Sequence, residues 1–495
     1  MKISIQELMK QSGVDFGTSG VRGLVSDMTD KVCVAYVIAF LQYLEQQDQI
    51  SPDDKVGIAG DLRNSSPRII KAAITACRMR GNQPIYCGLL PSPAIALYGI
   101  SQQMPTIMVT GSHIPDDRNG IKFNTPQGEI LKTDEKLIKE QFVELEDSLF
   151  DQAGYLMDAP DRLPVTEAAL EHYINRYVAF FPGQCLKGKH IGLYEHSSVA
   201  REVFRMILEK LGARVTSLGR SDLFIAVDTE AIRPEDTDAA LRWAAQHDFD
   251  CIVSTDGDGD RPLISDEKGQ WLRGDIAGIL SAAYLNADTV VTPISCNSAV
   301  EKSQLFASVI RTKIGSPYVI AGMQQALKEN LHASIVGYEA NGGFLQLTTI
   351  NRNGKVLAPL PTRDAIIVAL SVIQSASEQQ LSISQLVKKL PSRYTYSDRL
   401  KDFPTQLSQA RLTQFDTGNW QIDSDNIQKA FQTVSRPVSI DKTDGVRITL
   451  ENDDVIHLRP SGNAPELRCY TESNSAVAAK IINENCIQEM ASWRS

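Results

Sequence analysis

The sequence predicts an α/β protein of several domains, in which three successive α/β domains precede a smaller α+β domain. At 495 residues the chain is much longer than the roughly 100–200 residues of one ordinary domain. Short apolar segments typical of buried strands alternate with amphipathic segments of helical length through its first three quarters. Closer to the C-terminus, strand-like segments follow one another and end in a single amphipathic segment.

The first two rounds of layered elements follow this alternation. In the first we expect strands at Lys55–Asp61, Gln83–Gly88 and Thr106–Ser112, and a helix over Pro67–Arg80. The second begins near Lys189, with expected strands at 190–194, 213–219 and Cys251–Asp256 and helices over Ala200–Leu211 and Thr237–Gln246. No close repeat at a fixed period is present, so the rounds are related only in topology.

The remaining chain completes the third round and adds the last domain. We expect helices over Asp275–Leu285, Val319–Asn330 and Arg363–Ser375, and strands at 289–295, 308–315 and Ser334–Glu339. A polar stretch over 377–392 is typical of a connection or peripheral helix. After it we expect strands at 445–450, 454–460 and 466–473 and a helix over Ala476–Met490. The expected domains are residues 1–160, 161–268, 269–385 and 386–495.

Composition narrows the class of protein. With 42% hydrophobic and 22% charged residues, the chain is an ordinary globular protein and not a disordered one. A formal charge of −10 disfavours nucleic acid and membrane partners, since both need a basic face. The eight cysteines form no CxxC motif and are expected to be reduced thiols. We find no apolar core of a signal peptide and no run of about 18 apolar residues, so we expect a cytoplasmic protein.

An acidic loop, Asp256-Gly257-Asp258-Gly259-Asp260-Arg261, directly follows an expected strand. Three carboxylates at alternate positions can converge on one hard cation, and the glycines allow the tight turn that aims them. An EF-hand is a rival interpretation, with Glu267 at loop position 12, but Arg261 replaces the required glycine and a strand enters the loop. A solvated acidic turn is the plainer alternative, although clustered like charges are costly without a counter-ion.

A second candidate loop, Thr110-Gly111-Ser112-His113-Ile114-Pro115, ends another expected strand, where α/β folds generally place ligands. A serine beside a histidine is by itself usually just part of a loop. No GxSxG motif and no assignable Ser-His-Asp set are present, so acyl chemistry has little support.

Five motifs in order resemble those of the α-D-phosphohexomutase family over nearly the full chain. They are residues 16–23 (FGTSGVRG), the Ser112 loop, the acidic loop, residues 337–343 (GYEANGG) and residues 459–463 (RPSGN). The resemblance implies four domains around a central cleft, each giving one loop to the active site. Three departures are TGSHIP for the usual TASHNP, Asn341 for a common serine, and Gly343 for a frequent histidine.

The resemblance also implies roles for individual residues. Ser112 matches the phosphoserine, Arg22 and Lys122 match groups for proton transfer or charge stabilisation, and His113 lines the catalytic site. One Mg²⁺ per chain would be held by Ser112, Asp256, Asp258 and Asp260. The substrate-binding set is Arg261, Lys313, Glu339, Asn341, Arg459, Ser461, Gly462 and Asn463. The charges fit, because a phosphoserine adds roughly −1.5 to −2 charges beside three carboxylates, which a divalent ion and arginines can offset.

The implied activity is interconversion of hexose 6-phosphate and hexose 1-phosphate through a phosphoserine, with hexose 1,6-bisphosphate as intermediate and activator. Mannose phosphates are the expected main substrates and glucose phosphates additional ones, acted on by a monomer or homodimer. An amino-sugar phosphate mutase stays open, because EANG resembles the N-acetylglucosamine phosphate mutases. An inactive phosphosugar-binding regulatory protein and a metal-dependent phosphatase are further alternatives.

Overall fold

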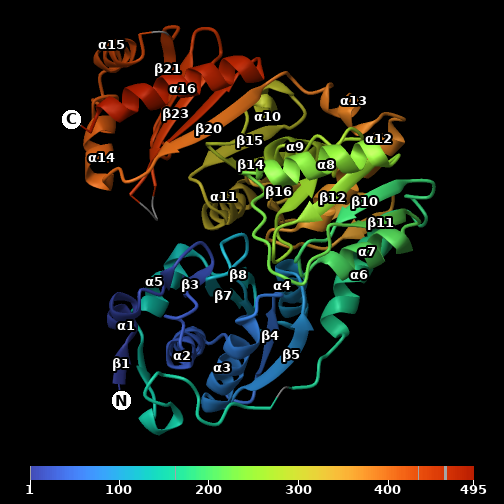
Figure 1. Ribbon diagram of the computed structural model, residues 1–495, viewed down its shortest axis with the longest axis vertical. Helices are drawn as coiled ribbons and strands as arrows, with labels where there is room; N and C mark the ends of the chain where they lie inside the picture. Colours follow the sequence, from blue (N-terminus) through green and yellow to red (C-terminus); the bar gives the residue numbers. More distant parts are fainter. Residues whose placement is uncertain (1, 162, 433, 462–464, 495) are drawn as a thin grey trace. The chain divides into compact units, whose positions relative to one another are not determined.

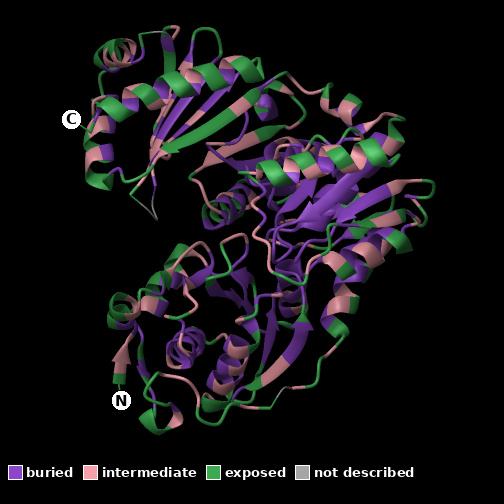
Figure 2. Ribbon diagram, viewed as in Figure 1, coloured by how far each residue is buried: buried purple, intermediate pink, exposed green. Residues whose placement is uncertain are grey.

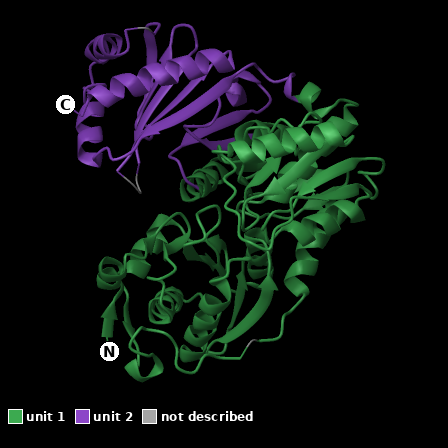
Figure 3. Ribbon diagram, in the orientation of Figure 1, with its two compact units in different colours: residues 1–288, 316–386 green, residues 289–315, 387–495 purple. Residues whose placement is uncertain are grey.

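The structure is a computed structural model that describes all residues except 1, 162, 433, 462–464 and 495. The chain forms two compact units (Figure 3). Unit 1 comprises residues 1–288 and 316–386, and unit 2 comprises residues 289–315 and 387–495. Each unit therefore contains two stretches of the chain that are separated in sequence.

Unit 1 begins with a seven-stranded sheet, its helices and a separate two-stranded sheet of β1 and β9 (Figure 1). The elements are β1 (Lys2–Ser4), α1 (Ile5–Ser12), β2 (Asp15–Phe16), β3 (Gly20–Leu24), α2 (Asp30–Gln46), β4 (Lys55–Gly60), α3 (Ser66–Met79), β5 (Gln83–Leu89), α4 (Ser92–Gln102), β6 (Thr106–Val109), β7 (Arg118–Thr125), β8 (Gly128–Glu129), α5 (Lys132–Lys139) and β9 (Phe142–Glu144), followed by a 3-10 turn at Asp147–Leu149. The sheet order is β2-β3-β7-β6-β4-β5, with β8 paired to β7.

The first sheet forms where the apolar runs predict it. β4 is buried from its second residue onward and pairs in parallel with both β5 and β6, which is typical of a central strand covered on both faces. α3 packs on β4 and β5, and α2 packs against α3. α3 carries a proline in its first turn, where the missing amide proton costs nothing.

A second sheet of unit 1 follows, in the order β11-β10-β12-β13. Its elements are α6 (Ala168–Phe180), β10 (His190–Tyr194), α7 (Arg201–Lys210), β11 (Arg214–Leu218), α8 (Pro234–Gln246), β12 (Cys251–Thr255), β13 (Pro262–Ile264) and α9 (Gly274–Tyr284). β12 is buried along its whole length (Figure 2). The order repeats the β5-β4-β6-β7 part of the first sheet, with the last strand antiparallel in both, so the expected topological relation is confirmed for these two rounds.

The last part of unit 1 contains two further pairs of antiparallel strands and a buried helix. Its elements are α11 (Ser316–Glu329), β16 (Ile335–Tyr338), β17 (Phe344–Gln346), β18 (Ile350–Arg352), β19 (Lys355–Leu357) and α12 (Ala365–Glu378), after which α13 (Ile383–Val387) follows. β16 and β17 form a hairpin, and α12 packs against α9. Asp364 caps α12, since its side chain accepts a hydrogen bond from the Ile366 amide.

Unit 2 contains β14 (Thr289–Pro293), α10 (Ala299–Lys302), β15 (Ser308–Thr312), β20 (Tyr394–Leu400), α14 (Thr405–Thr413), α15 (Trp420–Ala430), β21 (Pro437–Asp441), β22 (Val446–Leu450), β23 (Val455–Pro460), β24 (Leu467–Ser473) and α16 (Ala476–Ser492). β14 and β15 pair in parallel. The other strands form an antiparallel sheet in the order β20-β24-β23-β22-β21, and α16 packs along β20 and β24 (Figure 1). The expected strands and closing helix of the last domain are confirmed.

The cysteines form no disulfide bonds, as their spacing predicts. All eight are free thiols, and seven of them are buried. Burial raises the pKa of Cys33 and Cys77 to about 12, so these thiols stay protonated and unreactive at neutral pH. Within the described residues, none of the helices combines the length and the apolar character that a bilayer crossing requires.

Candidate active site

The acidic loop connects β12 to β13 and buries all three of its aspartates. Asp256, Asp258 and Asp260 are each at most 1% exposed, and one carboxylate oxygen from each lies within 4.8 Å of the others. The loop passes very close to the Ser112 loop, because a Cβ at Gly257 would lie 2.7 Å from the Ser112 carbonyl oxygen. Glycine at this position therefore permits the approach of the two loops.

Ser112 lies at the end of β6, where the strand pattern predicts a ligand site. Its Oγ donates a hydrogen bond to Asp256 Oδ2 at 2.6 Å, and its side chain is almost completely buried. Its backbone is left-handed, with φ at 54°. Thr110 Oγ1 accepts from the Ser112 amide at 2.8 Å, and the Arg63 guanidinium donates to the carbonyls of Ser112 and Ile114. These contacts fix the serine in an uncommon backbone conformation.

Lys122, on β7, joins the acidic loop from the first sheet. Its Nζ lies 2.6 Å from Asp258 Oδ2 and 2.6 Å from Asp260 Oδ2. Burial opposes its charged form, but Asp258 and Asp260 outweigh burial and raise the pKa of Lys122. Ser92 Oγ also donates to Asp258 Oδ2, at 2.6 Å. Lys122 is therefore a charged group that pairs with the acidic loop from β7.

The carboxylates fit a hard divalent cation. Asp258 Oδ1 and Asp260 Oδ1 are buried and accept no hydrogen bond, although unpaired buried oxygens are costly. Burial, together with Asp258 and Asp260, raises the pKa of Asp256, as expected when like charges share a site. Carboxylate oxygens are the ligands that Mg²⁺ prefers. Among the described residues, no other group of three such ligands comes together.

The EF-hand interpretation does not fit the structure. Glu267, which would be its last ligand, accepts hydrogen bonds from the hydroxyls of Ser382 and Ser384 and from the Ser384 amide. The entering element is the strand β12. The loop is therefore a strand-end site of the kind found in α/β folds.

Three guanidinium groups lie close enough to influence one another beside the acidic loop. Burial first, and then Arg261 and Arg363, lower the pKa of Arg22 to about 10. Arg261, then burial and Arg22, lower the pKa of His113 to about 2. His113 Nδ1 accepts from Arg261 Nη1 at 2.8 Å, so His113 is neutral. The positive charges of Arg22 and Arg261, which repel each other beside the acidic loop, favour the binding of an anion such as phosphate.

The GYEANGG loop turns between β16 and β17 and orients Glu339 and Asn341. The Glu339 amide donates to the Gly343 carbonyl at 3.0 Å, and Asn341 Oδ1 accepts from the Gly343 amide at 2.9 Å. Thr229 Oγ1 donates to the Asn341 carbonyl at 2.7 Å. Glu339 Oε2 is buried without a hydrogen bond, and burial raises the pKa of Glu339. A carboxylate with an unused oxygen suits sugar hydroxyls.

The second phosphate-binding candidate belongs to unit 2. Arg459 is the next-to-last residue of β23, and its Nε lies 2.8 Å from Asp444 Oδ2. The Ile314 amide donates to the same oxygen at 3.0 Å, so exposed Lys313 adjoins this group. Arg459 and Ser461 line a pocket of about 440 Å³. Gly462 and Asn463 lie outside the described residues.

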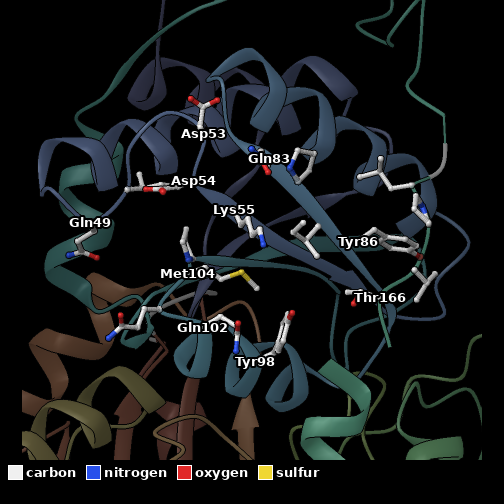
Figure 4. Close-up of a pocket in the computed structure, with 18 residues that line it drawn as sticks. Gln49, Asp53, Asp54, Lys55, Gln83, Tyr86, Tyr98, Gln102, Met104 and Thr166 are labelled. Atoms are coloured by element: carbon white, nitrogen blue, oxygen red, sulfur yellow. The ribbon is translucent and has the colours of Figure 1, made fainter. Parts of the chain in front are cut away.

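A pocket of about 870 Å³ in unit 1 is separate from these residues (Figure 4). Lys55 and Gln83 line it, and they begin the parallel strands β4 and β5. Met104 lines it as well, just before β6. Ser112 follows the opposite end of β6, so this pocket lies at the wrong edge of the sheet to take part in chemistry at Ser112.

Sequence reasoning brought together Ser112, Lys122, Arg22, His113, Arg261, the three aspartates, Glu339 and Asn341, and the structure places all of them in unit 1. It missed Arg63, which holds the Ser112 loop, and Arg363, which contacts Asp260 and Glu339. It also missed Glu129, whose carboxylate accepts from Ser316 and Thr362. The Arg363-Asp364 pair marks the start of α12, because aspartate commonly precedes a helix, but it gives no sign that Arg363 contacts the site.

The chain matches domain families of one enzyme family along most of its length. The three alpha/beta/alpha domain families I, II and III of phosphoglucomutase/phosphomannomutase match residues 13–148, 171–269 and 273–394, and the C-terminal domain family matches residues 416–488. A phosphomannomutase from Salmonella muenchen is 44% identical, over 98% of this chain and 97% of that protein. One from Sinorhizobium fredii is 40% identical, over 94% of this chain and 97% of that protein.

Solved structures agree on the fold. A phosphoglucomutase/phosphomannomutase family protein from Burkholderia thailandensis matches with a TM-score of 0.73 and 17% identity, over 99% of this chain and 98% of that one. The expected series of three α/β domains and a C-terminal domain is confirmed. The chain belongs to the phosphoglucomutase/phosphomannomutase family and is an isomerase of the phosphohexomutase type.

Proposed function

We propose that this isomerase interconverts mannose 6-phosphate and mannose 1-phosphate, accepts glucose phosphates as further substrates, and carries the phosphoryl group on Ser112. The names of the two relatives above support mannose phosphates as the main pair. The observation that carries the mechanism is the 2.6 Å contact between Ser112 Oγ and Asp256 Oδ2, beside two more buried aspartates.

In the proposed cycle, phosphorylated Ser112 donates its phosphoryl group to the free hydroxyl of a hexose phosphate. The bond between phosphorus and the sugar oxygen forms and the bond to Ser112 Oγ breaks. The proton of the sugar hydroxyl passes through a basic group of the site to the departing Ser112 Oγ, which leaves a neutral serine. The resulting hexose 1,6-bisphosphate reverses its orientation in the site and returns its other phosphoryl group to Ser112. Arg22 and Lys122 stabilise the charge that develops during both transfers.

The three aspartates and phosphorylated Ser112 would hold Mg²⁺. When bound, the ion offsets the negative charge of the transferring phosphoryl group. Asp258 Oδ1 and Asp260 Oδ1, which are buried and accept no hydrogen bond, support this assignment. The guanidiniums of Arg22 and Arg261 contribute positive charge to the same phosphate, and neutral His113 accepts from Arg261 and keeps it in place.

Substrate recognition is divided between two sets of residues. Glu339 and Asn341 bind sugar hydroxyls, for which Glu339 has a buried oxygen that accepts no hydrogen bond. The non-reacting phosphate is assigned to a set of residues in unit 2: Lys313, Arg459, Ser461, Gly462 and Asn463. Arg459 and Ser461 line a pocket there, and Lys313 is exposed. An arginine beside hydroxyl and backbone donors suits a dianion.

A second candidate is an amino-sugar phosphate mutase, which the EANG sequence of the sugar loop favours. A coupled assay with the 1-phosphates of mannose, glucose, glucosamine and N-acetylglucosamine tests both candidates. We expect mannose 1-phosphate to give the highest kcat/KM. Detection of phosphate on Ser112 by mass spectrometry, together with turnover, argues against a regulatory binding protein, and release of inorganic phosphate would instead indicate a phosphatase.

A further inference from the structure

Arg363 is almost completely buried among acidic side chains from three parts of unit 1. Its Nη2 lies 3.1 Å from Asp260 Oδ2 in the acidic loop, and its Nη1 lies 3.8 Å from Glu339 Oε2 in the sugar loop. Nη2 also donates to Ser19 Oγ at 3.3 Å and lies 4.0 Å from Glu129 Oε2. One guanidinium therefore contacts both loops that the proposed reaction needs.

The backbone of this segment is fixed beside the sugar loop. The Asp364 amide donates to the Phe344 carbonyl at 2.9 Å, one residue after Gly343. The Asp364 side chain caps α12, so Arg363 precedes the helix and its side chain is not part of the helical surface. The guanidinium consequently reaches the two loops from a rigid element.

Gly343 provides the space through which the Arg363 side chain passes. A Cβ at position 343 would lie 2.6 Å from Arg363 Cδ and 2.7 Å from Arg363 Cγ. Gly343 is not among the glycines with positive φ, so its backbone conformation does not itself require glycine. The requirement is for space, and any larger residue would displace the arginine.

The charges around Arg363 explain why it is held in place and not free to bind substrate. Three carboxylates, from Asp260, Glu129 and Glu339, surround a group with little exposed surface. A planar guanidinium can serve several carboxylates at once, which a lysine ammonium does less well. The contacts therefore act between protein loops.

We propose that Arg363 is a positioning residue that fixes Glu339 of the sugar loop relative to Asp260 of the metal-binding loop, and that Gly343 is required because it accommodates the Arg363 side chain. This rests on the proposed function for the roles of the two loops. Arg363 acts through Glu339 and Asp260 and does not contact the substrate.

The test compares Arg363→Met, Arg363→Lys and Gly343→Ala with two controls in the full-length protein. Arg68→Met removes an arginine that pairs with Asp30, and Gly183→Ala adds a methyl group where nothing lies within 4 Å. We expect Arg363→Met and Gly343→Ala to lower kcat/KM about 100-fold, the scale of a 1 Å misplacement. Arg363→Lys should recover part of this loss, and both controls should stay within about threefold of wild type.

Hydrogen exchange of the sugar loop provides a measurement that does not depend on activity. In Arg363→Met and Gly343→Ala, the amides of residues 338–343 should exchange at least about tenfold faster, while both controls leave them unchanged. An unchanged exchange rate in an inactive Arg363→Met protein would overturn the proposal, since Arg363 would then act on the substrate directly. Faster exchange in a protein whose wild type lacks mutase activity would contradict only the proposed function.

The double variant Arg363→Ala with Gly343→Ala tests the link between the two residues, because alanine lacks the Cγ and Cδ atoms that a Cβ at position 343 would meet. If Gly343 matters only as space for the arginine, the double variant should be no worse than Arg363→Ala alone. Losses that multiply would show that Gly343 acts independently, and would overturn that part of the proposal.

Discussion

Ser112 Oγ donates its hydrogen to Asp256 Oδ2, 2.6 Å away, and links the loop after β6 to the loop after β12. Replacing Ser112 with alanine removes the proposed phosphoryl carrier but little packing. We expect Ser112→Ala to lower kcat by at least about a thousandfold, with a melting temperature close to that of wild type. The check is a mutase assay with hexose 1,6-bisphosphate present, alongside calorimetry. Near-normal turnover in a clean preparation would exclude the serine mechanism.

Asp258 has one oxygen paired with Lys122 and one unpaired oxygen, so its replacement tests the proposed metal site. Asp258→Asn removes a ligand charge, and we expect the Mg²⁺ concentration for half-maximal activity to rise at least about tenfold while kcat falls. Asp266→Asn is the matched control, because Asp266 caps a nearby turn through Lys268 and Gln270. If wild-type activity survives EDTA, the metal assignment fails.

Arg459 lies in the unit 2 pocket and pairs with Asp444. If it grips the non-reacting phosphate, Arg459→Ala should raise KM about tenfold or more and lower kcat to a smaller extent, because remote binding also orients the reacting end. Arg399→Ala, in the same unit, removes a half-exposed arginine near Glu466 and serves as control. The measurement is steady-state kinetics with mannose 1-phosphate. An unchanged KM would show that Arg459 does not bind the phosphate.

In the proposed cycle, Glu339 and Asn341 would bind a bisphosphate in two opposite orientations. Hydroxyls O3 and O4 near the middle of the ring nearly superpose after the flip, whereas C2 does not, and mannose and glucose differ only at C2. We expect mannose 1-phosphate and glucose 1-phosphate to differ in kcat/KM by about 10–200-fold, with N-acetylglucosamine 1-phosphate much poorer. A preference for the N-acetylated sugar would promote the amino-sugar candidate.

His457 is buried in unit 2, and burial first of all lowers its pKa to about 4. The folded state therefore favours neutral His457, and the stability it contributes is present above pH 6.5 and is lost as the pH falls towards 4. At pH 5 the loss relative to pH 8 should be about 2 kcal/mol. His457→Asn should reduce the difference between the free energies of unfolding at pH 5 and pH 8, measured by urea titration. His332→Asn, at an exposed position, should leave this difference unchanged.

Buried parallel strands were the most predictable part of the fold. β4 and β12 are short apolar runs bounded by turn residues, and both lie within one residue of their expected ends. Helix starts were less accurate, because capping side chains set them: α12 begins at Ala365 after the Asp364 cap, two residues later than expected. No element was predicted for α2, which is buried on nearly all sides and therefore shows no amphipathic period.

The candidate site was predictable where its residues lie in short motifs, as with Ser112 and the three aspartates. Arg363 could not be found in this way, because its partners Asp260, Glu339 and Glu129 are distant in sequence and meet it only in the folded chain. The same holds for Arg63, which supports the Ser112 loop through backbone carbonyls that carry no sequence signal.

The left-handed backbone at Ser112 has an evolutionary consequence. With φ at 54°, the position suits glycine or asparagine better than serine, and retaining serine costs about 1 kcal/mol of stability. Once catalysis is no longer selected, drift towards the more stable residue should replace the proposed phosphoryl carrier early. Position 112 is therefore the first place to look for loss of the proposed serine mechanism among relatives of this chain.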